Sequence, residues 1–360
     1  MGEIGAFLAA AGVRERALVV LVLTILALIV LSLAFASYTI LLRASTVLSE
    51  KRWRRLTALW EEPVLNAVLG SETAPQVHAT VEPRYRLHFV RFVLEYSRRV
   101  KGEERAVLRS LALPYLGPLA ARSRSPRNEV RTRAVQTLGT LGLPTYAAEV
   151  IAALDDPSPL VAMVAARALC REEYPQYLPD VLLRLGRFEG WSPSFMSSML
   201  AAVGPAAAGP LREALADAAR PPSARAVAAE ALRVLSDLES ADTAAAVAEK
   251  EQHPDLVAAA LRLLTVVGRP EHIEVIRARC ASADFAVRAS AASALGTLAL
   301  EEDRMRLLGA MSDPSPWVAI AGARALVAAG GCAALKELGD SDHPRALLAQ
   351  QVLLEEGRDG

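Results

Sequence analysis

Apolar residues recur along the chain at helical spacing, and a complete helix-start signal recurs with them. In Asp155–Cys170 (D-D-P-S-P-L-V-A-M-V-A-A-R-A-L-C), apolar side chains fall at i, i+1, i+4, i+5, i+8 and i+9 counted from Leu160. They form one stripe on a helix of about 3.6 residues per turn. Ser158 and Pro159 predict where this helix begins, because a hydroxyl caps a free backbone N–H and proline fits the first helical position. The same unit returns at Asp313–Leu326 as D-P-S-P-W-V-A-I-A-G-A-R-A-L.

One frame describes the repeats: an apolar residue, a small residue four positions later, and a large apolar residue four positions further on. Successive frames begin 29 to 34 residues apart, most often 31. This period suits two short helices and two turns, the unit of an α-solenoid. The small middle residue allows neighbouring helices to approach closely. The frames are Val130/Ala134/Leu138, Val161/Ala165/Leu169, the looser Phe195/Met199/Val203, Ala224/Ala228/Leu232, Leu256/Ala260/Leu264, Val287/Ala291/Leu295 and Val318/Gly322/Leu326.

These units resemble HEAT and HEAT-like repeats. The residues that carry the resemblance are the helix-opening D-P-S-P, the V-R pairs at Val130–Arg131 and Val287–Arg288, and A-x-x-x-L-G at Ala291–Gly296. The resemblance covers roughly residues 86–360 and implies an all-α, right-handed α-solenoid of HEAT-like helical hairpins. Some units depart from the pattern. Ala162, Val257 and Ala319 stand where arginine is often found and Phe195 begins an atypical unit, so a continuous arginine ladder is not expected.

A long apolar segment precedes the repeats. Residues 17–42 contain no charge and are dense in Leu, Val and Ile. At about 1.5 Å per residue, such a helix exceeds the ~30 Å hydrocarbon layer and spans it with some tilt. The alternative is a cleavable signal peptide, but the run is longer than the usual apolar core of about 7–15 residues, and only Ala34–Ala36 offers a small-residue pair. We therefore predict one retained N-terminal transmembrane helix.

Flanking charge predicts the orientation of this helix. Arg14 and Arg16 precede it, and five basic residues follow it: Arg43, Lys51, Arg52, Arg54 and Arg55. The positive-inside rule then places the N-terminus outside the inner membrane and the C-terminal solenoid in the cytoplasm. The three cysteines, Cys170, Cys280 and Cys332, have neither disulfide-framework nor metal spacing, which fits a reducing compartment.

The basic residues Arg43, Lys51, Arg52, Arg54 and Arg55, together with Trp53, have two interpretations. In one, the helix lies on anionic lipid headgroups with Trp53 or Trp60 near the interface. In the other, they are a stop-transfer cluster leading into the first helix of the solenoid. The predicted division is a tail (1–16), a transmembrane helix (17–42), a basic juxtamembrane helix and linker (43–85) and a solenoid (86–360).

Charge is distributed unevenly, although the net charge is zero. Residues 1–136 carry 20 Lys and Arg against 11 Asp and Glu, whereas residues 137–360 carry 20 against 29. A chain that is basic near its anchor and acidic away from it suits an anionic membrane surface. The acidic distal half and the lack of aromatic residues interleaved with the basic ones argue against binding to nucleic acid.

Motifs for chemistry are missing from the sequence. The five histidines are dispersed, and no H-E-x-x-H, G-x-S-x-G, P-loop or G-x-G-x-x-G motif occurs. Asp155–Asp156 and the cluster Glu301–Asp303 fit loop and cap positions. We therefore expect no enzyme activity, no cofactor and no metal.

Two functional classes follow. The first is a non-catalytic, membrane-anchored scaffold for protein–protein interaction, whose second helices present the surface that binds a protein partner. The second is an enzyme with a site assembled on the concave face, since HEAT-like repeats also occur in bilin lyases and a DNA-repair glycosylase. The residues expected on or beside the partner-binding surface are Arg131, Met163, Arg167, Arg225, Arg288 and Arg324.

A further resemblance narrows the first class. An anchor, a basic segment with tryptophan (K-R-W-R-R-L-T-A-L-W-E-E-P-V-L) and HEAT units follow one another here, as in bacterial membrane HEAT-repeat proteins whose genes commonly neighbour a membrane glycosyltransferase. The resemblance implies an accessory subunit of an envelope polysaccharide synthase.

Overall fold

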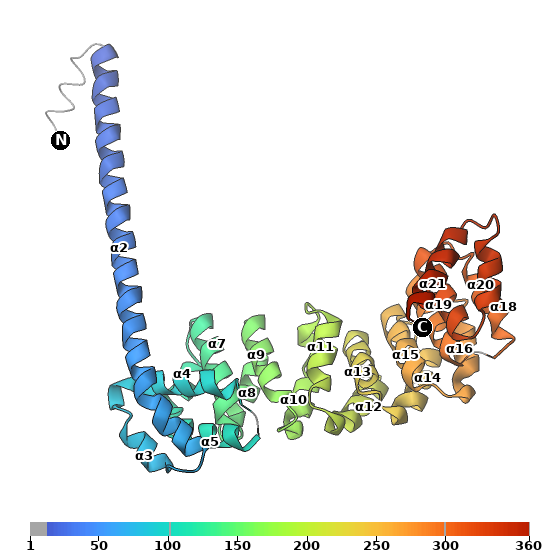
Figure 1. Ribbon diagram of the computed structural model, residues 1–360, viewed down its shortest axis with the longest axis horizontal. Helices are drawn as coiled ribbons and strands as arrows, with labels where there is room; N and C mark the ends of the chain where they lie inside the picture. The colour runs from blue at the N-terminus through green and yellow to red at the C-terminus, as the bar shows by residue number, and fades with distance from the viewer. Residues whose placement is uncertain (1–12, 101, 299, 360) are drawn as a thin grey trace. The chain divides into compact units, whose positions relative to one another are not determined.

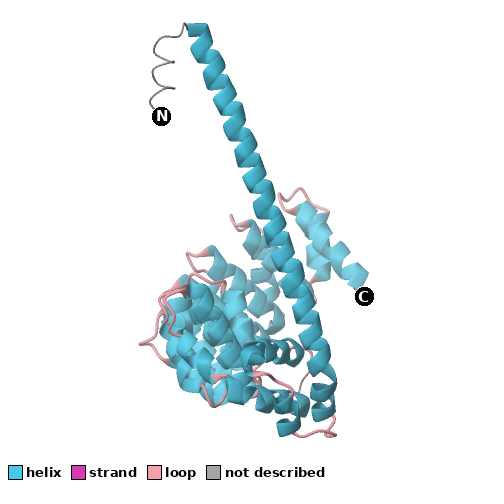
Figure 2. Cartoon of the chain, turned by 90° about the vertical axis from the view of Figure 1, so that its left-hand side faces the viewer, coloured by secondary structure: helices cyan, strands magenta, loops and turns pink. Residues whose placement is uncertain are grey.

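The computed structural model describes residues 13–100, 102–298 and 300–359, and in these ranges it contains helices joined by loops and no strand (Figure 2). The chain divides into two compact units between Tyr115 and Leu116. The predicted all-α class is thus confirmed. Most of the predicted N-terminal tail, residues 1–12, lies outside the described residues.

Helix α2 dominates the first unit. It runs without a break over 56 residues, from the apolar stretch into the folded part (Figure 1). Its segment Val20–Leu41 has a mean hydropathy of 2.8 over a window with no buried residue, so it is long and apolar enough to cross a membrane or to serve as a signal sequence. The elements of this unit are α2 (Val13–Val68), α3 (Ala74–Ala79), η1 (Pro83–Tyr85), α4 (Arg86–Ser97), α5 (Gly102–Ala112) and η2 (Leu113–Tyr115).

The core of the first unit forms around Trp60, which is fully buried. Its ring meets Phe89 edge-on with centroids 5.4 Å apart and lies 5.8 Å from Phe92. Two polar contacts continue this packing along α2 and α4, because Arg91 stacks over the Trp53 ring and the Tyr96 hydroxyl donates to Glu61 Oε1 at 2.7 Å. The lower part of α2 is therefore an integral part of a folded helical unit.

The second unit is a row of helical hairpins in which a shorter first helix precedes each second helix (Figure 1). Its elements are α6 (Gly117–Arg122), α7 (Asn128–Thr137), η3 (Leu138–Gly142), α8 (Ala147–Ala152), η4 (Ala153–Asp155), α9 (Pro159–Leu169), η5 (Pro175–Tyr177), α10 (Leu178–Leu182), η6 (Leu185–Phe188), α11 (Pro193–Ala201), η7 (Pro205–Ala207), α12 (Ala208–Ala216), α13 (Pro222–Leu235), η8 (Leu238–Ser240), α14 (Ala241–Lys250), α15 (Pro254–Val267), η9 (Pro270–His272), α16 (Ile273–Arg279), α17 (Phe285–Leu298), α18 (Asp303–Ala310), α19 (Pro316–Ala328), α20 (Cys332–Gly339) and α21 (Ala346–Asp359).

Every predicted repeat frame begins on the second helix of a hairpin: α7, α9, α11, α13, α15, α17 and α19. The middle residues of the frames are buried, as expected for close helix packing. Two glycines illustrate how closely the helices approach one another. A Cβ added at Gly296 would lie 2.6 Å from Cα of Ala325, and one added at Gly322 would lie 3.1 Å from the carbonyl oxygen of Leu307. Neither position has room for a side chain.

The repeat that begins at Phe195 is irregular in space as well as in sequence. Neighbouring second helices pack directly against one another from α11 to α19, whereas α9 and α11 make little direct contact. The short segment η6 packs against both α9 and α13 instead. The longer spacing before Phe195 therefore corresponds to these inserted residues.

One local prediction is wrong. Ser158 precedes α9 as expected, with Pro159 in its first turn, but its hydroxyl makes no capping bond. The carboxylate of Asp156 accepts the Ser158 N–H at 2.8 Å instead. The same arrangement recurs between Asp313 and the N–H of Ser315. In D-P-S-P the aspartate thus organises the turn, because its oxygen reaches the N–H two residues later.

The close approach at Gly296 can be tested directly. In Gly296→Ala, the new methyl group forces α17 and α19 apart, and we expect a loss of about 1–3 kcal/mol of stability, the usual cost of overpacking. The measurement is the thermal unfolding midpoint of the full chain in detergent.

Gly309→Ala is the matched control, because Gly309 lies in helix α18 with nothing within 4 Å of an added Cβ. Alanine there should be neutral or should stabilise by up to about 1 kcal/mol through its helix propensity. Equal melting temperatures for the two variants would contradict the proposed role of Gly296.

Candidate protein-interaction surface

The residues predicted to contact a partner all lie on second helices of the second unit. The structure places Arg131 on α7, Met163 and Arg167 on α9, Arg225 on α13, Arg288 on α17 and Arg324 on α19. Their side chains, however, divide into a group used inside the solenoid and a group that faces solvent.

Arg131 and Arg288 bridge neighbouring repeats in the same way. Arg131 donates from Nε and Nη2 to the two carboxylate oxygens of Asp156 at 2.7 and 2.8 Å. Arg288 meets Asp313 with the same pair of atoms at 2.8 and 2.9 Å. In each case Nη1 donates to backbone carbonyls of the loop before its own helix, at Ser125 and Ser282. Both guanidinium groups are therefore engaged in fork-to-fork ion pairs between repeats.

Arg225 and Met163 are buried. Arg225 is 4% exposed, donates to the carbonyl of Leu215 at 2.9 Å and pairs with Glu251 at 2.6 Å. Met163 is also 4% exposed and packs in the core. These two side chains, like Arg131 and Arg288, hold the solenoid together and are not displayed on its surface.

Arg167 and Arg324 face solvent. The side chain of Arg324 is 65% exposed and contacts Glu355 of α21 at 3.2 Å. Such an exposed pair contributes little to stability because water screens both charges. Of the predicted residues, these two are the ones that a partner can reach without rearrangement.

The bridging carboxylates carry lowered pKa values. Hydrogen bonding to Arg131 lowers the pKa of Asp156, and hydrogen bonding to Arg288 lowers that of Asp313. Backbone N–H donors from Ser158 and Ser315 act in the same direction, against the partial desolvation that opposes ionisation. The aspartate of each D-P-S-P turn therefore stays ionised and joins two repeats.

First helices carry a parallel set of bridges. Arg277 on α16 binds both carboxylate oxygens of Asp303 on α18 at 2.7 Å. Arg184 reaches Asp155 at 2.9 Å, and Arg212 reaches Asp237 at 3.3 Å. The acidic residues at Asp155–Asp156 and Glu301–Asp303 that the sequence assigned to loops and caps thus pair with arginines. Asp156, Glu302 and Asp303 meet arginines of the preceding repeat, whereas Asp155 meets Arg184 of the following one.

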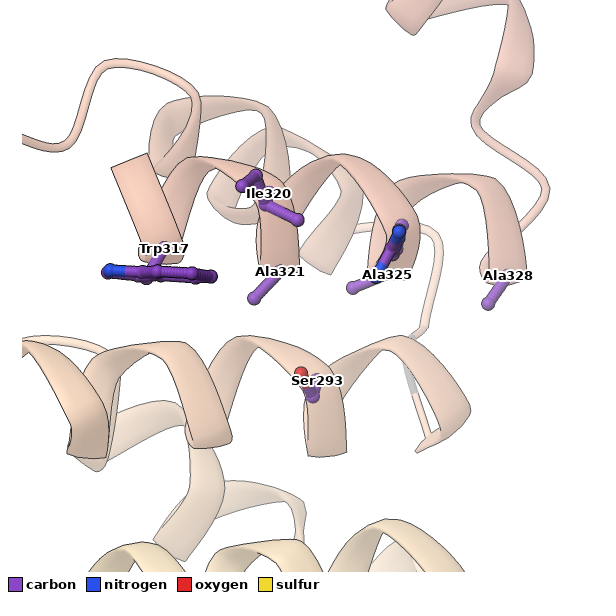
Figure 3. Close-up of a pocket in the computed structure, with 7 residues that line it drawn as sticks. Ser293, Trp317, Ile320, Ala321, Ala325 and Ala328 are labelled. Atoms are coloured by element: carbon purple, nitrogen blue, oxygen red, sulfur yellow. The ribbon is translucent and has the colours of Figure 1, made fainter. Parts of the chain in front are cut away.

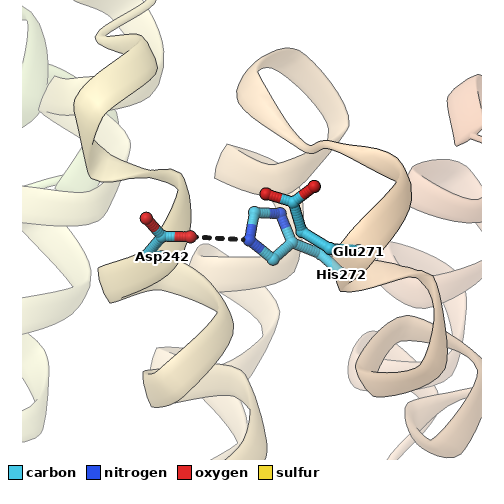
Figure 4. Close-up of side chains that lie close together, drawn as sticks. All are labelled: Asp242, Glu271 and His272. Atoms are coloured by element: carbon cyan, nitrogen blue, oxygen red, sulfur yellow. Dashed lines mark hydrogen bonds and ion pairs between the residues drawn. The ribbon is translucent and has the colours of Figure 1, made fainter.

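A cluster of Asp242, Glu271 and His272 has the spacing of a metal site (Figure 4). His272 Nε2 contacts Asp242 Oδ1 at 3.0 Å, and His272 Nδ1 accepts the backbone N–H of Arg269. The Arg269 guanidinium pairs with both carboxylates. Because Arg269 pairs with both acids and both ring nitrogens have partners, these side chains form an inter-repeat contact between α14 and η9.

One serine–histidine pair has the composition of a nucleophile and its base. Ser312 Oγ lies 3.1 Å from His343 Nε2. The other nitrogen, Nδ1, accepts the backbone N–H of Arg345 at 3.0 Å, so a neutral ring carries its proton on Nε2. That tautomer donates to the serine and does not remove its proton. Among the cysteines, burial raises the pKa of the Cys170 thiol to about 12, which keeps it protonated.

The predicted membrane-contacting residues lie on the part of α2 between the apolar stretch and the Trp60 core. Trp53 is half-buried against Arg91, Arg54 pairs with Glu50 on the same helix, and Trp60 is fully buried. The side chains of Arg43, Lys51, Arg52 and Arg55 are exposed. This segment leads directly into the Trp60 core of the first unit, and both interpretations of its basic residues stay predictions.

A groove that sequence reasoning missed lies between α17 and α19 (Figure 3). Its volume is about 280 Å³, and it is lined by Ser293, Trp317, Ile320, Ala321, Arg324 and Ala328. Trp317 is 65% exposed. The signal available in the sequence was the tryptophan in D-P-S-P-W, followed by alanines at helical spacing.

Comparison with known proteins agrees with this architecture. Residues 241–327 match the family model of HEAT repeats. No curated protein sequence matches the chain.

Solved structures with similar chains are repeat proteins and enzymes of low sequence identity. The CpcE–CpcF complex of phycocyanin lyase from Nostoc sp. is 21% identical, with a TM-score of 0.33, over 66% of this chain and 86% of that one. Human deoxyhypusine hydroxylase is 20% identical, with a TM-score of 0.31, over 79% and 98%. Kap121p is 15% identical, with a TM-score of 0.39, over 84% of this chain and 39% of its own.

The bridges between repeats predict how stability depends on pH. Arg288→Gln removes the ion pair with Asp313, and we expect a loss of about 1.5–3 kcal/mol at pH 7, typical of hydrogen bonds to charged groups. The pKa of Asp313 lies lower in the folded chain than the ordinary value of about 3.9, so the bridge stabilises fully above that value. Its contribution is lost as the pH falls through the folded pKa.

The measurement is the thermal midpoint of both proteins between pH 7 and pH 3, where the difference between them should shrink below about pH 4. Arg324→Gln is the control, because its exposed pair should contribute only about 0–1 kcal/mol at any pH. A difference between wild type and Arg288→Gln that is constant over this pH range would contradict the bridge.

Proposed function

We propose that this HEAT-repeat protein is a non-catalytic scaffold, anchored in the inner membrane by one helix, whose solenoid holds a protein partner at the cytoplasmic face. The observation that carries this proposal is helix α2. It joins the apolar stretch to the buried Trp60 core without a loop. Such an anchor would hold the first folded unit in a set position relative to the membrane, because that unit is not attached through a flexible linker.

The length of the helix sets a distance from the membrane. Fifteen residues separate Leu41, the last residue of the apolar stretch, from Leu56, the first buried residue of the core. At ~1.5 Å per residue this segment is about 22 Å long. The core of the first unit would therefore begin clear of the headgroups, whose layer is only about 5–8 Å deep on each side.

The same geometry refines the proposed contacts with anionic lipid. Arg43 follows Leu41 by two residues and would lie within the headgroup layer. Lys51, Arg52, Trp53, Arg54 and Arg55 would lie about 15–21 Å beyond the apolar stretch, and therefore outside a headgroup layer about 5–8 Å deep. We therefore assign lipid contact to Arg43 and leave the basic residues further along for a partner surface.

The side-chain contacts support a role without catalysis. The acidic clusters of the described residues are occupied by arginines, and the Ser312–His343 pair has its proton on the wrong atom for base catalysis. The alternative remains an enzyme of the lyase or glycosylase type with a site assembled on the concave face. It predicts a bound small molecule in place of a protein partner.

The resemblance to bacterial membrane HEAT-repeat proteins supplies the nature of the partner. We propose a membrane glycosyltransferase of envelope polysaccharide synthesis, with this chain as its accessory subunit. A rigid anchor in the same membrane suits such a partner, because both proteins are then confined to one plane and their effective concentration is raised.

The test is crosslinking in intact membranes, followed by purification in mild detergent and mass spectrometry of what remains attached. We expect one membrane protein in stoichiometric amount, and we expect that removing residues 1–42 releases the chain from the membrane fraction and abolishes the crosslink. The truncated chain retains the Trp60 core, so its melting temperature should stay unchanged and serves as the folding control.

Two results would contradict the proposal. A chain that leaves the membrane as a pure protein carrying only a small molecule would favour the enzyme. Unaltered surface polysaccharide after deletion of the gene would remove the glycosyltransferase as partner while leaving the scaffold intact.

A further inference from the structure

We propose that the groove between α17 and α19 binds a peptide segment of the protein partner in which an apolar side chain and a carboxylate stand about 10 Å apart. The inference rests on the proposed scaffold function and identifies the site and the chemistry by which the partner is held. Three features of the groove carry it: an exposed tryptophan, an exposed arginine and a floor of small residues.

The floor is small because α17 and α19 approach closely. Gly296 abuts the backbone of Ala325, and the residues along the open side are Ser293, Ala321 and Ala328. In Figure 3, the side chains of Ala321, Ala325 and Ala328 point from α19 toward the helix that carries Ser293. A side chain entering the groove therefore reaches both helices without displacing a large residue.

The wall at one end is Trp317, whose ring remains 65% exposed. A tryptophan offers a large rigid surface at low conformational cost, and such residues are the commonest anchors of protein interfaces. The corresponding residue of the other D-P-S-P turn is Leu160, which is also exposed but has no aromatic ring. The groove at Trp317 is thus set apart from an otherwise similar repeat.

The other end carries Arg324, seven residues after Trp317 and on the same face of α19. Two helical turns separate their Cα atoms by about 10 Å. The guanidinium already holds one carboxylate, that of Glu355, at 3.2 Å. With side chains 65% and 46% exposed, this pair is screened by water and open to exchange, so a carboxylate of the partner can replace or join Glu355.

The groove is small. Its volume of about 280 Å³ lies below the ~300–1,000 Å³ of pockets that enclose small-molecule ligands. It suits one aromatic or two aliphatic side chains of a longer segment. Three residues of a polyproline II segment, at ~3.1 Å each, complete one turn and return a side chain to the same face after about 9 Å, so an apolar side chain can lie on Trp317 and an acidic one on Arg324.

The experiment uses the full chain in lipid nanodiscs and a phage-displayed library of random 12-residue peptides as the probe. We expect selected peptides to share an apolar residue followed three positions later by Asp or Glu. The Kd of the selected peptides is measured by fluorescence anisotropy. Trp317→Ala and Arg324→Gln should each raise this Kd by about tenfold or more, as expected for the loss of an aromatic or charged anchor. Replacing the peptide's Asp or Glu by Asn or Gln should weaken its binding to wild type but should not weaken its binding to Arg324→Gln any further.

Leu160→Ala is the matched control, since it truncates the equivalent exposed residue outside the groove and should leave the Kd unchanged. Selected peptides that bind Trp317→Ala as tightly as wild type, or that lack an acidic residue, would overturn the proposal, and so would a library that yields no binder. The crosslinked partner separates the two proposals. If wild type and Trp317→Ala retain the same crosslinked partner equally well, the peptide-binding groove is contradicted and the scaffold function is not. If wild type retains no partner, the scaffold function itself is contradicted.

Discussion

Close contact between successive second helices sets the geometry on which the rest of the solenoid depends. A single hairpin buries too little apolar surface to be stable, and each repeat therefore relies on its neighbours. Alanine or glycine at the middle of each regular frame, and glycine at positions such as Gly296, brings these helices within backbone contact. Dispersion and apolar burial then act along the full length of each helix. Small and aliphatic side chains supply most of this packing, because the aromatic content of the chain is only 5%.

The spacing that results brings the arginines within reach of the next loop. Arg131 and Arg288 meet aspartates 25 residues further along the chain. Their bidentate geometry requires a fixed position of the next turn relative to the helix that carries the arginine. The same aspartates hold the N–H groups of Ser158 and Ser315, so one carboxylate shapes its own turn and ties it to the preceding repeat. The ion pairs stabilise the register of the repeats, and apolar packing supplies most of the stability.

The sequence predicted the helices and the repeat frame because both depend on local spacing, as for Val130, Ala134 and Leu138. It did not predict which arginines face solvent. Arg225 and Arg324 occupy similar second helices, yet one is buried against Glu251 and the other is exposed. The two stand at different places in the frame, since Arg225 follows the first residue of its frame by one position and Arg324 by six, but the frame alone does not say which of these places meets the next repeat's loop. The groove at Trp317 was missed for the same reason, since its floor combines residues of two helices.

Few arginines of the solenoid remain available to bind a partner. An arginine that is spent inside the solenoid cannot also bind a partner, so the pairing of Arg131, Arg225 and Arg288 leaves few positions for recognition. Where such positions are few, the direction in which they are presented matters. A continuous helix joins the apolar stretch to the Trp60 core of the first unit without a flexible linker. In the proposed function, rigid attachment of this kind reduces the orientational entropy that the first unit loses when the protein binds its partner.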